Sequence, residues 1–475
     1  MTRLTRSLAA GLLIGVCAAP LAAQRQFSEQ MRPYIAVEAP VVAITNVTVI
    51  DGTGAPARRG QTVVLEGRRI AALGPAGSVR VPSGAHTVDG SGHTLIPGMM
   101  GLHDHLYYTA AGGRGATLVY SAPRLYLGSG VTTVRTTGSR APYSELNMKA
   151  EIERGNWPGP RIHITAPYIT GGDGITTMTL IDTPEEARRF VRYWSDEGAT
   201  WLKAYTNIGY EQFQAAIDEA HKLGMKVTGH ICSISFTEAV GLGIDNIEHG
   251  LFTNSDYDPS KKQSECPMTF MQHAVNVDID GPEVANTFRL MIDHNVPMTS
   301  TLAVYELFVP NRPTKDPRAL EAMAPEVRTD YLKAREQIDS SPNAAFSPEA
   351  FQKAMAYERK FVAMGGLLAA GVDPTGNGGA LPGYGDQRNF ELLREAGFSP
   401  EEAVQIMSLN GARILGVDGE LGSIEAGKTA DLVLIRGDLT GDPAVIKDVV
   451  TVFKDGIGFD SKKLLDDVKG RVGIS

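Results

Sequence analysis

The sequence contains 475 residues, of which 43% are hydrophobic and 21% charged. Such a chain can bury a large core and has room for two or three domains, or for one large barrel with an appended module. Its formal net charge is -9, and an acidic surface argues against a nucleic acid or an anionic membrane as the partner.

The first 23 residues have the pattern of a secretory signal peptide. Arg3 and Arg6 precede an apolar run from Leu8 to Ala19, and Leu21-Ala22-Ala23 offers small residues for cleavage. The run is short for a membrane span, and Cys17 lacks the small preceding residue of a lipoprotein signal. We therefore expect cleavage and release into the periplasm or the medium, without membrane attachment.

The released chain keeps two cysteines, Cys232 and Cys266. Two thiols allow one disulfide in an oxidising compartment, but they form no disulfide framework, and the sequence does not show whether they meet. The favoured interpretation is two separate buried thiols.

Residues 24–94 and 416–475 are predicted to form one small β-sandwich domain. Each flank contains short strand patterns separated by Gly-rich turns, and neither has enough strands to be stable alone. The predicted strands are 41–50, 61–66, 69–74 and 86–89 in the first flank, and 431–435 and 448–454 in the second.

Residues 95–415 alternate strand and helix patterns, which indicates an α/β fold, the (β/α)8 TIM barrel. A doubly wound sheet is the alternative, weakened because no Gly-rich phosphate-binding turn follows an early strand. The predicted strands are 94–103, 131–137, 161–168, 201–206, 226–232, 246–251, 296–302 and 367–373, and the clearest helices are 184–197, 210–223, 348–364 and 400–415. Connections 252–281 and 305–347 are long enough to be functional, and we expect them to be lids that shape the substrate site.

Four of the ten histidines stand at the ends of predicted barrel strands. His103 and His105 are two residues apart, so both imidazoles point to the same side of a strand. His230 and His249 end two later strands. Active sites of such barrels lie where the strands end, which makes these four residues candidate metal ligands.

Asp373 and Lys203 complete the pattern. Asp373 follows an apolar run, where a carboxylate must be paired, hydrogen-bonded or bound to a metal. It could instead be a turn residue before Pro374, but beside four histidines we interpret it as a ligand. Lys203 lies between apolar neighbours, which is costly for an ammonium group. It could reach solvent, pair with a carboxylate, or become carbamylated and bridge two metal ions.

Together these motifs resemble the metal-dependent amidohydrolase superfamily. The branch that the chain resembles most contains the Xaa-Pro and Xaa-Arg dipeptidases, the ochratoxin-type amidases and the imidazolonepropionases. The motifs are Leu95 to His105 on strand one, Lys203 on strand four, His230 on strand five, Glu248-His249-Gly250 on strand six, Asp373 on strand eight, and the tail segments 409–416 and 421–434.

The resemblance implies a binuclear centre with two divalent metal ions, and zinc is the metal that we expect. His103, His105 and Asp373 would hold one ion, His230 and His249 the second, and carbamylated Lys203 would bridge them. Imidazole and oxygen ligands also suit cobalt, manganese or iron.

The implied reaction is attack on an amide by a hydroxide that bridges the metals. Asp373 would act as general base and then as general acid. Tyr205, on the same face of its strand as Lys203, would donate to the oxyanion, or simply pack. Arg135 and Arg388 are candidates for binding a substrate carboxylate, with surface ion pairing as the alternative for each.

We therefore expect a secreted amidohydrolase that cleaves a small molecule, either a dipeptide such as Xaa-Pro or an N-acyl amino acid. The alternatives are a mononuclear imidazolonepropionase or deaminase, against which Lys203 argues, and an esterase, lactonase or phosphotriesterase on the same site. A non-catalytic barrel is disfavoured because every ligand position is kept. A homo-oligomer is compatible with the family.

Overall fold

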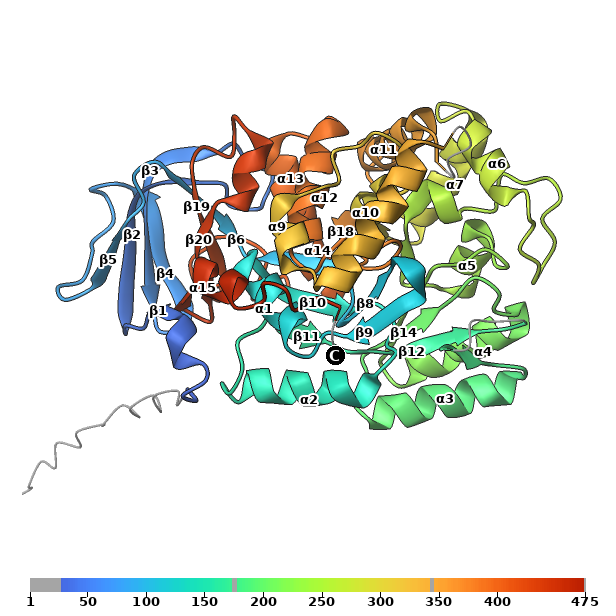
Figure 1. Cartoon of the computed structure of the whole chain (residues 1–475), viewed down its shortest axis with the longest axis horizontal. Coiled ribbons are helices and arrows are strands. Elements are labelled where there is room, and N and C mark those ends of the chain that lie inside the picture. Colours follow the sequence, from blue (N-terminus) through green and yellow to red (C-terminus); the bar gives the residue numbers. More distant parts are fainter. Residues whose placement is uncertain (1–26, 173–176, 342–345, 474–475) are drawn as a thin grey trace, which may run out of the picture.

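The computed structural model describes residues 27–172, 177–341 and 346–473. The predicted signal peptide, residues 1–23, lies outside these ranges. Within them, no helix has the length and apolar character required to cross a bilayer. The described chain has two parts, a sheet made by both ends of the chain and an α/β body formed by its middle (Figure 1).

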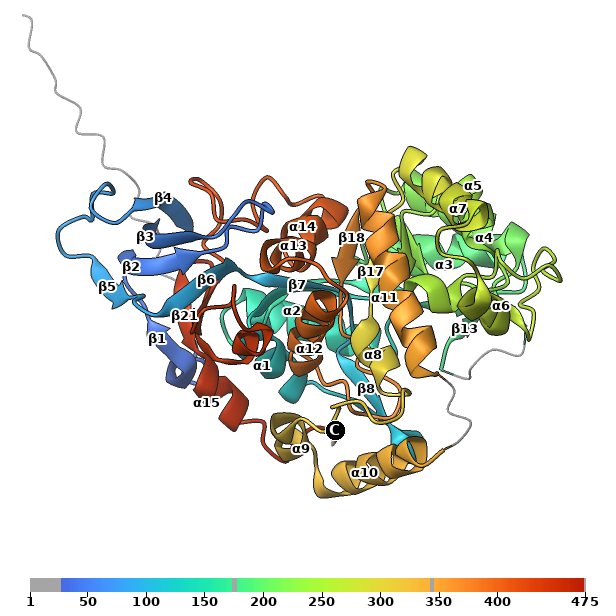
Figure 2. The same cartoon turned by 90° about the horizontal axis from the view of Figure 1, so that it is seen from above.

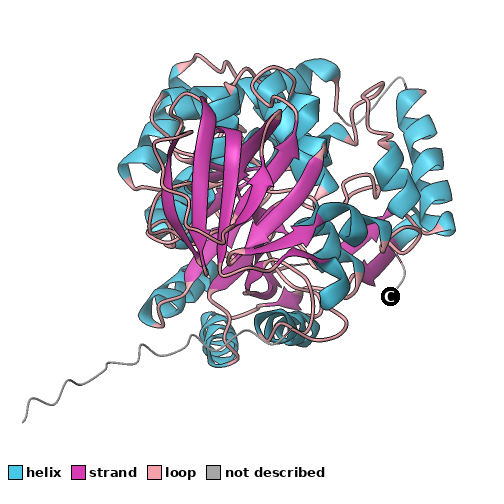
Figure 3. Ribbon diagram, turned by 90° about the vertical axis from the view of Figure 1, so that its left-hand side faces the viewer, coloured by secondary structure: helices cyan, strands magenta, loops and turns pink. Residues whose placement is uncertain are grey.

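Nine of the described strands form one sheet, in the order β1-β21-β20-β19-β6-β2-β3-β4, with β5 paired to β2 (Figure 3). The two flanks meet where β19 pairs antiparallel with β6. Hydrogen bonds thus join the two flanks in one continuous sheet, and the predicted sandwich is not confirmed. The strands are β1 (Ile35–Val37), β2 (Val41–Val49), β3 (Arg58–Glu66), β4 (Arg69–Pro75), β5 (His86–Asp89), β6 (His93–Pro97), β19 (Leu432–Arg436), β20 (Val449–Lys454) and β21 (Ile457–Asp460).

The middle of the chain supplies parallel strands in two adjoining sheets, β11-β10-β7 and β13-β12-β14-β15-β16-β17-β18. The fold is TIM-barrel-like, although regular strand pairing does not close a ring among the described residues. At one seam the backbone N–H of Asp373 donates to the carbonyl of His103 at 2.8 Å. The strands are β7 (Met99–Asp104), β10 (Val131–Thr136), β11 (Arg161–His163), β12 (Thr165–Thr170), β13 (Thr179–Leu180), β14 (Trp201–Ala204), β15 (Lys226–Gly229), β16 (Asn246–Glu248), β17 (Met298–Ser300) and β18 (Leu368–Ala370).

Helices follow these strands and cover the outside of the parallel sheets, and a short hairpin, β8 (Tyr107–Ala110) with β9 (Arg114–Thr117), follows β7 (Figures 1 and 2). The helices of the body are α1 (Ser121–Gly128), α2 (Pro142–Glu153), α3 (Pro184–Asp196), α4 (Tyr210–Lys222), α5 (Phe236–Leu242), α6 (Phe270–Asn276), α7 (Pro282–Asp293), α8 (Leu302–Glu306), α9 (Pro317–Ala322), α10 (Pro325–Asp339), α11 (Pro348–Ala363), α12 (Tyr384–Glu395), α13 (Pro400–Ile406) and α14 (Leu409–Leu415), and α15 (Ser461–Asp466) follows β21.

The predicted first barrel strand, 94–103, is divided at Gly98 into β6 and β7. Pro97 has no N–H to donate, and a Cβ on Gly98 would lie 2.1 Å from the Thr132 hydroxyl oxygen. The chain therefore leaves the nine-stranded sheet through β6 and enters the barrel as β7, as Figure 2 shows from above.

Two further predicted elements are also divided. The strand at 161–168 breaks into β11 and β12 at the seam between the two parallel sheets. The helix at 400–415 breaks into α13 and α14 because Ser408 leaves helical geometry, with φ -138° and ψ -83°. There the Met407 carbonyl accepts from the Met100 N–H of β7 at 2.8 Å.

The long connections contain helices of their own. Connection 252–281 carries α6, and connection 305–347 carries α9 and α10. The rings of Phe252 and Tyr305, which begin the two connections, lie 4.7 Å apart. Their role as lids stays a prediction.

Cys232 and Cys266 form a disulfide, so the expectation of two separate thiols is wrong. Their Cα atoms are 5.0 Å apart although 34 positions separate them in the sequence. Cys232 follows β15, and the bond ties connection 252–281 to the end of that strand. Spacing alone could not reveal this pairing, because it depends on the path of the connection.

Replacing both cysteines, by Cys232→Ala and Cys266→Ala, should lower the free energy of unfolding by about 3–4 kcal/mol, because the unfolded chain regains the freedom of this loop. Denaturant titration under non-reducing conditions measures the change. Dithiothreitol should destabilise the original protein and leave the double variant unchanged. A non-reducing peptide map with the two cysteines in unlinked peptides would contradict the bond.

Candidate metal centre

The structure gathers the six predicted ligands at one end of the parallel strands. Parallel strands present their carboxyl ends at the same edge, so residues remote in sequence meet there. The set consists of His103 and His105 at the end of β7, Lys203 on β14, His230 after β15, His249 after β16 and Asp373 after β18.

His103, His105 and Asp373 form the tightest cluster. One potential ligand atom from each lies within 4.8 Å of the others. The Nε2 atom of His105 is 3.2 Å from Asp373 Oδ1, and Nε2 of His103 is 3.7 Å from Oδ2. Two imidazoles and a carboxylate at these separations could hold a divalent metal ion.

His230 and His249 stand directly beside this cluster. Their ring centroids are 4.3 Å apart, and the His249 ring is 4.4 Å from that of His103. His249 and Asp373 both have positive φ, 70° and 47°. Left-handed backbone is costly for residues other than glycine and concentrates at functional sites, so the fold holds both side chains at the centre against local preference.

Lys203 is 1% exposed, and its Nζ atom has no hydrogen-bond partner among the described residues. It therefore does not reach solvent. It also forms no ion pair within 4 Å in the described part of the chain. Burial lowers the pKa of Lys203 to about 8, against the opposing effect of the Glu248 and Asp373 charges. Carbamylation of this amine stays a prediction.

Hydrogen bonds fix which ring nitrogen of the first two histidines faces the centre. His103 Nδ1 donates to Glu248 Oε2 at 2.7 Å, and His105 Nδ1 donates to the Gly138 carbonyl at 3.3 Å. A neutral imidazole with its proton on Nδ1 presents a lone pair on Nε2. These outer partners therefore leave both Nε2 atoms available as ligands.

His249 shares this arrangement. Its Nδ1 atom is hydrogen-bonded with the Thr301 hydroxyl at 2.7 Å. Its Nε2 atom is buried without a partner among the described residues and lies 4.0 Å from Asp373 Oδ2. The unpartnered atoms of His249 and Lys203 are what a metal ion and a carbamate bridge would satisfy.

Burial keeps the imidazoles neutral. It lowers the pKa of His230 to about 3, with the Lys203 charge acting in the same direction. It also lowers the pKa of His103, His105 and His249. Burial opposes ionisation of Asp373 as well, but His103 and His105 hold the pKa of this carboxyl below its ordinary value. Neutral imidazoles beside a carboxylate are the protonation states that metal ligands need.

Glu248 is a buried hydrogen-bond acceptor on the side of His103 that faces away from the centre. The sequence analysis did not predict this role. Besides the His103 ring, its carboxylate accepts from Arg135 Nη2 at 2.5 Å, from Asn246 Nδ2 at 2.8 Å and from the Thr228 hydroxyl. The available signal was a carboxylate within a buried strand, next to a predicted ligand.

The two arginines considered for a substrate carboxylate do not face the centre. Arg135 has no exposed surface and pairs with Glu248. Arg388 pairs with Glu306 at 2.7 Å and with Glu391 at 2.8 Å. Both arginines form ion pairs, but the Arg135 pair is buried, so the alternative of surface pairing is wrong for Arg135.

Tyrosines lie beside the histidines of the centre. The Tyr205 ring is 4.7 Å from that of His230, beside the centre, and the side chain is half-buried. Tyr168, which the sequence analysis did not single out, places its hydroxyl 3.3 Å from His105 Nε2 and contacts the Tyr107 hydroxyl. Tyr305 packs against His249 at 5.6 Å between ring centroids.

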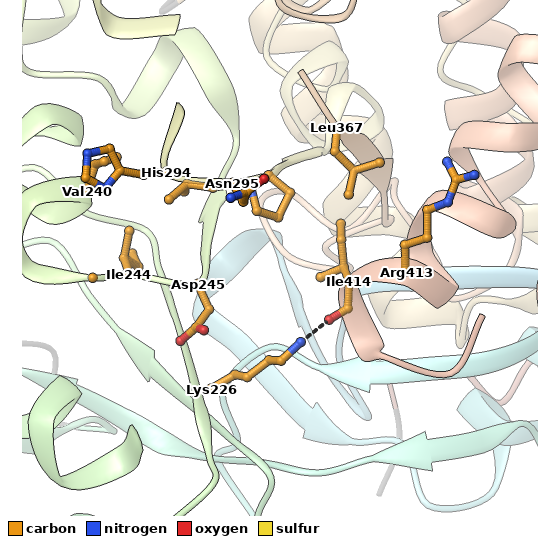
Figure 4. A pocket seen from close by; sticks show the side chains of 12 residues that line it. Lys226, Val240, Ile244, Asp245, His294, Asn295, Leu367, Arg413 and Ile414 are labelled. Atoms are coloured by element: carbon orange, nitrogen blue, oxygen red, sulfur yellow. Dashed lines mark hydrogen bonds between the residues drawn. The ribbon is translucent and has the colours of Figure 1, made fainter. Parts of the chain in front are cut away.

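A separate cavity of about 350 Å³ lies at the opposite end of the strands (Figure 4). Lys226 and Asp245 line it where β15 and β16 begin, and the Lys226 ammonium donates to the Ile414 carbonyl at 2.7 Å. The Asp245 carboxylate accepts from the Val227 N–H at 2.8 Å. These polar groups are satisfied by the fold, so this cavity is not the site of the chemistry.

Comparison with known proteins places these observations in a family. A model described as "Amidohydrolase family" matches residues 94–458. The imidazolonepropionase of Porphyromonas gingivalis is 24% identical over 83% of this chain and 86% of its own length.

Solved structures show the same fold. A candidate prolidase from Bifidobacterium longum has a TM-score of 0.63 at 26% identity, over 90% of this chain and 98% of its own. A Xaa-Pro dipeptidase with bound methionine in the active site has a TM-score of 0.65 at 21% identity, over 88% of this chain and 100% of its own.

Glu248→Gln should lower the free energy of unfolding by about 3–5 kcal/mol, because it leaves the Arg135 guanidinium buried without a counter-charge. It should also weaken metal binding about 10- to 100-fold through loss of the His103 acceptor. Denaturant unfolding and metal titration measure the two effects.

Glu358→Gln is the matched control. Glu358 is also buried, and burial raises its pKa to about 8, so this carboxyl is mostly neutral at pH 7. A neutral amide should replace it with a change of less than about 1 kcal/mol. Equal losses in the two variants would contradict the role of the Glu248 charge.

Proposed function

Because the chain belongs to the amidohydrolase family and is a hydrolase of carbon–nitrogen bonds, we propose that it is an exported binuclear metal-dependent amidase. The proposed substrates are dipeptides such as Xaa-Pro, or N-acyl amino acids. The observation that carries the proposal is the cluster of His103, His105 and Asp373, with the unpartnered Lys203 amine beside it.

In this proposal two divalent ions, with zinc as the favoured metal, share the six side chains. His103, His105 and Asp373 would hold one ion, His230 and His249 would hold the second, and carbamylated Lys203 would supply an anionic ligand between the two sets. When bound, such ions lower the pKa of water and polarise a carbonyl. The donor set fits them, because neutral imidazoles face the centre and two buried nitrogen atoms have no other partner among the described residues.

Lys203 has the properties that carbamylation requires. Carbon dioxide adds to the neutral amine, and with a pKa of about 8 roughly a tenth of the amine is neutral at pH 7. An N–C bond forms and the nitrogen releases one proton, so the product is a carbamate anion in place of the buried positive charge. The Lys203 charge acts to lower the pKa of His103, His105, His230 and His249, so the amine is within electrostatic range of all four imidazoles.

The side chains of the centre have distinct tasks in the reaction. The Asp373 carboxylate, ionised at neutral pH, accepts a proton from the attacking water and delivers it to the leaving amine. The half-buried Tyr205 hydroxyl donates to the oxyanion that forms on the scissile carbonyl. Glu248 keeps the His103 ring in one orientation throughout.

The known proteins support an amide of an amino acid as the substrate. The prolidase and Xaa-Pro dipeptidase likenesses favour cleavage next to an amino acid, and the imidazolonepropionase relative supplies the alternative, a cyclic amide in a mononuclear site. The buried Lys203 argues for the binuclear reading. An esterase, lactonase or phosphotriesterase would use the same residues on a different bond.

Export is supported by the disulfide between Cys232 and Cys266. Disulfides persist in oxidising compartments and are rare in the cytosol. The signal pattern of residues 1–23 gives the same localisation, periplasmic or secreted.

Metal analysis should find two ions per chain, and Lys203→Ala should reduce this to one or fewer, because the bridge between the two sets of ligands is lost. Reconstitution of metal-free protein should also be faster with added bicarbonate. Lys226→Ala is the control, because Lys226 lies on the neighbouring strand β15 but at the end of the strands away from the centre. This variant should keep both ions. One ion in the original protein with a fully active Lys203→Ala variant would exclude the bridge.

Metal-loaded protein should hydrolyse members of a panel of Xaa-Pro and Xaa-Arg dipeptides and N-acyl amino acids. Asp373→Asn should lower kcat by about 100-fold or more through loss of proton transfer and keep the circular dichroism of the original protein. Imidazolonepropionate, esters and phosphotriesters in the same panel test the alternatives. Turnover confined to those comparators would reject the proposed substrate class.

A further inference from the structure

We propose that Arg140 binds the carboxylate of the substrate, which selects amides whose leaving amine carries an α-carboxylate. This inference rests on the proposed function and adds the group that recognises the substrate. It replaces the two arginines, Arg135 and Arg388, that the sequence suggested for this task and that the structure shows in other ion pairs.

Arg140 lies in the loop between β10 and α2, at the same end of the strands as the metal ligands. This loop is fixed against the centre. The Gly138 carbonyl accepts from His105, and Ser139 forms a parallel bridge with Pro167. Gly138 has φ +93°, and a Cβ there would meet the Tyr168 ring at 2.5 Å. The backbone that carries Arg140 therefore has little freedom to move away.

A stack of side chains joins the Arg140 guanidinium to the centre. Its Cζ atom is 4.6 Å from the Tyr107 ring centroid. The Tyr107 ring in turn stacks on the His105 ring, 4.5 Å away at an angle of 25°. The cation thus lies two short contacts from a predicted metal ligand. Its charge also acts to lower the pKa of His105 and Tyr205, which places it within electrostatic range of both.

Arg140 has no hydrogen bond or ion pair with any residue that the structure describes, and its Nε atom is buried without an acceptor. The side chain is half-buried, with part of it open to solvent. Two other arginines, the buried Arg135 and the half-buried Arg161, do have carboxylate partners, Glu248 and Asp431. A buried donor left unpaired is costly, so an incoming acceptor at Arg140 gains binding energy that the fold has not used.

The hydrogen-bonding geometry of the guanidinium and the position of the carboxylate in the proposed substrates both indicate that Arg140 binds a carboxylate. A guanidinium binds a carboxylate through two parallel hydrogen bonds. In a dipeptide or an N-acyl amino acid, only the amide nitrogen and one Cα atom separate the scissile carbonyl from the carboxylate. A scissile carbonyl at the centre would therefore leave the carboxylate close to the predicted ligands, where Arg140, beside Tyr107, offers a guanidinium that is unpaired among the described residues. A substrate with a neutral carboxamide at this position lacks the paired charge.

Binding without bond cleavage tests this proposal. The probes are N-methanesulfonyl derivatives of L-proline, L-arginine and L-phenylalanine, each as the free acid and as the carboxamide, titrated calorimetrically into the metal-loaded protein. The original protein should bind at least one acid about 10- to 100-fold more tightly than its carboxamide. Arg140→Gln should abolish this preference, and Arg140→Lys should keep part of it.

Arg80→Gln is the matched control, because Arg80 is exposed between β4 and β5 and undergoes the same change of charge. It should leave the preference unchanged. Equal binding of acid and carboxamide by the original protein would overturn the proposal, and so would a preference that persists in Arg140→Gln. An equal loss of affinity for both probes would assign Arg140 to the support of Tyr107 alone. Hydrolysis of the amide panel separately decides the proposed function.

Discussion

The buried ion pair between Arg135 and Glu248 is the interaction on which the centre depends. It joins β10 to β16, and the second carboxylate oxygen of Glu248 accepts from His103 on β7. Three strands from both parallel sheets are thereby tied together beneath the ligands. A buried charge without its partner is strongly destabilising, so folding must complete this network and, in doing so, orient the His103 ring.

Burial then sets the protonation states of the whole centre. The same desolvation lowers the pKa of the imidazoles and the pKa of Lys203. Both kinds of side chain therefore favour their neutral forms, in which the nitrogen has a free lone pair. Asp373 escapes this trend because His103 and His105 favour its charged form. One dry environment therefore favours the neutral forms of the imidazoles and of the lysine amine together, which are the forms that the proposed metal ligands and bridge require.

The sequence predicted the parallel α/β body, the joining of the two flanks and the gathering of six polar residues at one edge, because apolar runs mark where strands end. The role of these residues as ligands stays a prediction. Three of the four donors to Glu248, which are His103, Arg135 and Thr228, come from other strands, so no local pattern shows them. Arg135 and Arg140 are five positions apart and chemically identical. Their environments differ because strand β10 ends at Thr136. Arg135 is therefore buried within the strand, whereas Arg140 lies in the loop that follows it.

In the proposed enzyme, the residues that carry out the reaction are therefore different from the residues that select the substrate. The predicted ligands stand at strand ends, where the sheets fix them, whereas the groups that a substrate would meet first come from connections. Arg140 belongs to the loop after β10, and Tyr107 to the hairpin after β7. The disulfide ties connection 252–281 to Cys232, two residues after His230. Side-chain substitutions in these loops can therefore change the groups around the proposed substrate site while the hydrogen bonds behind His103 and His249, made by Glu248 and Thr301, stay intact.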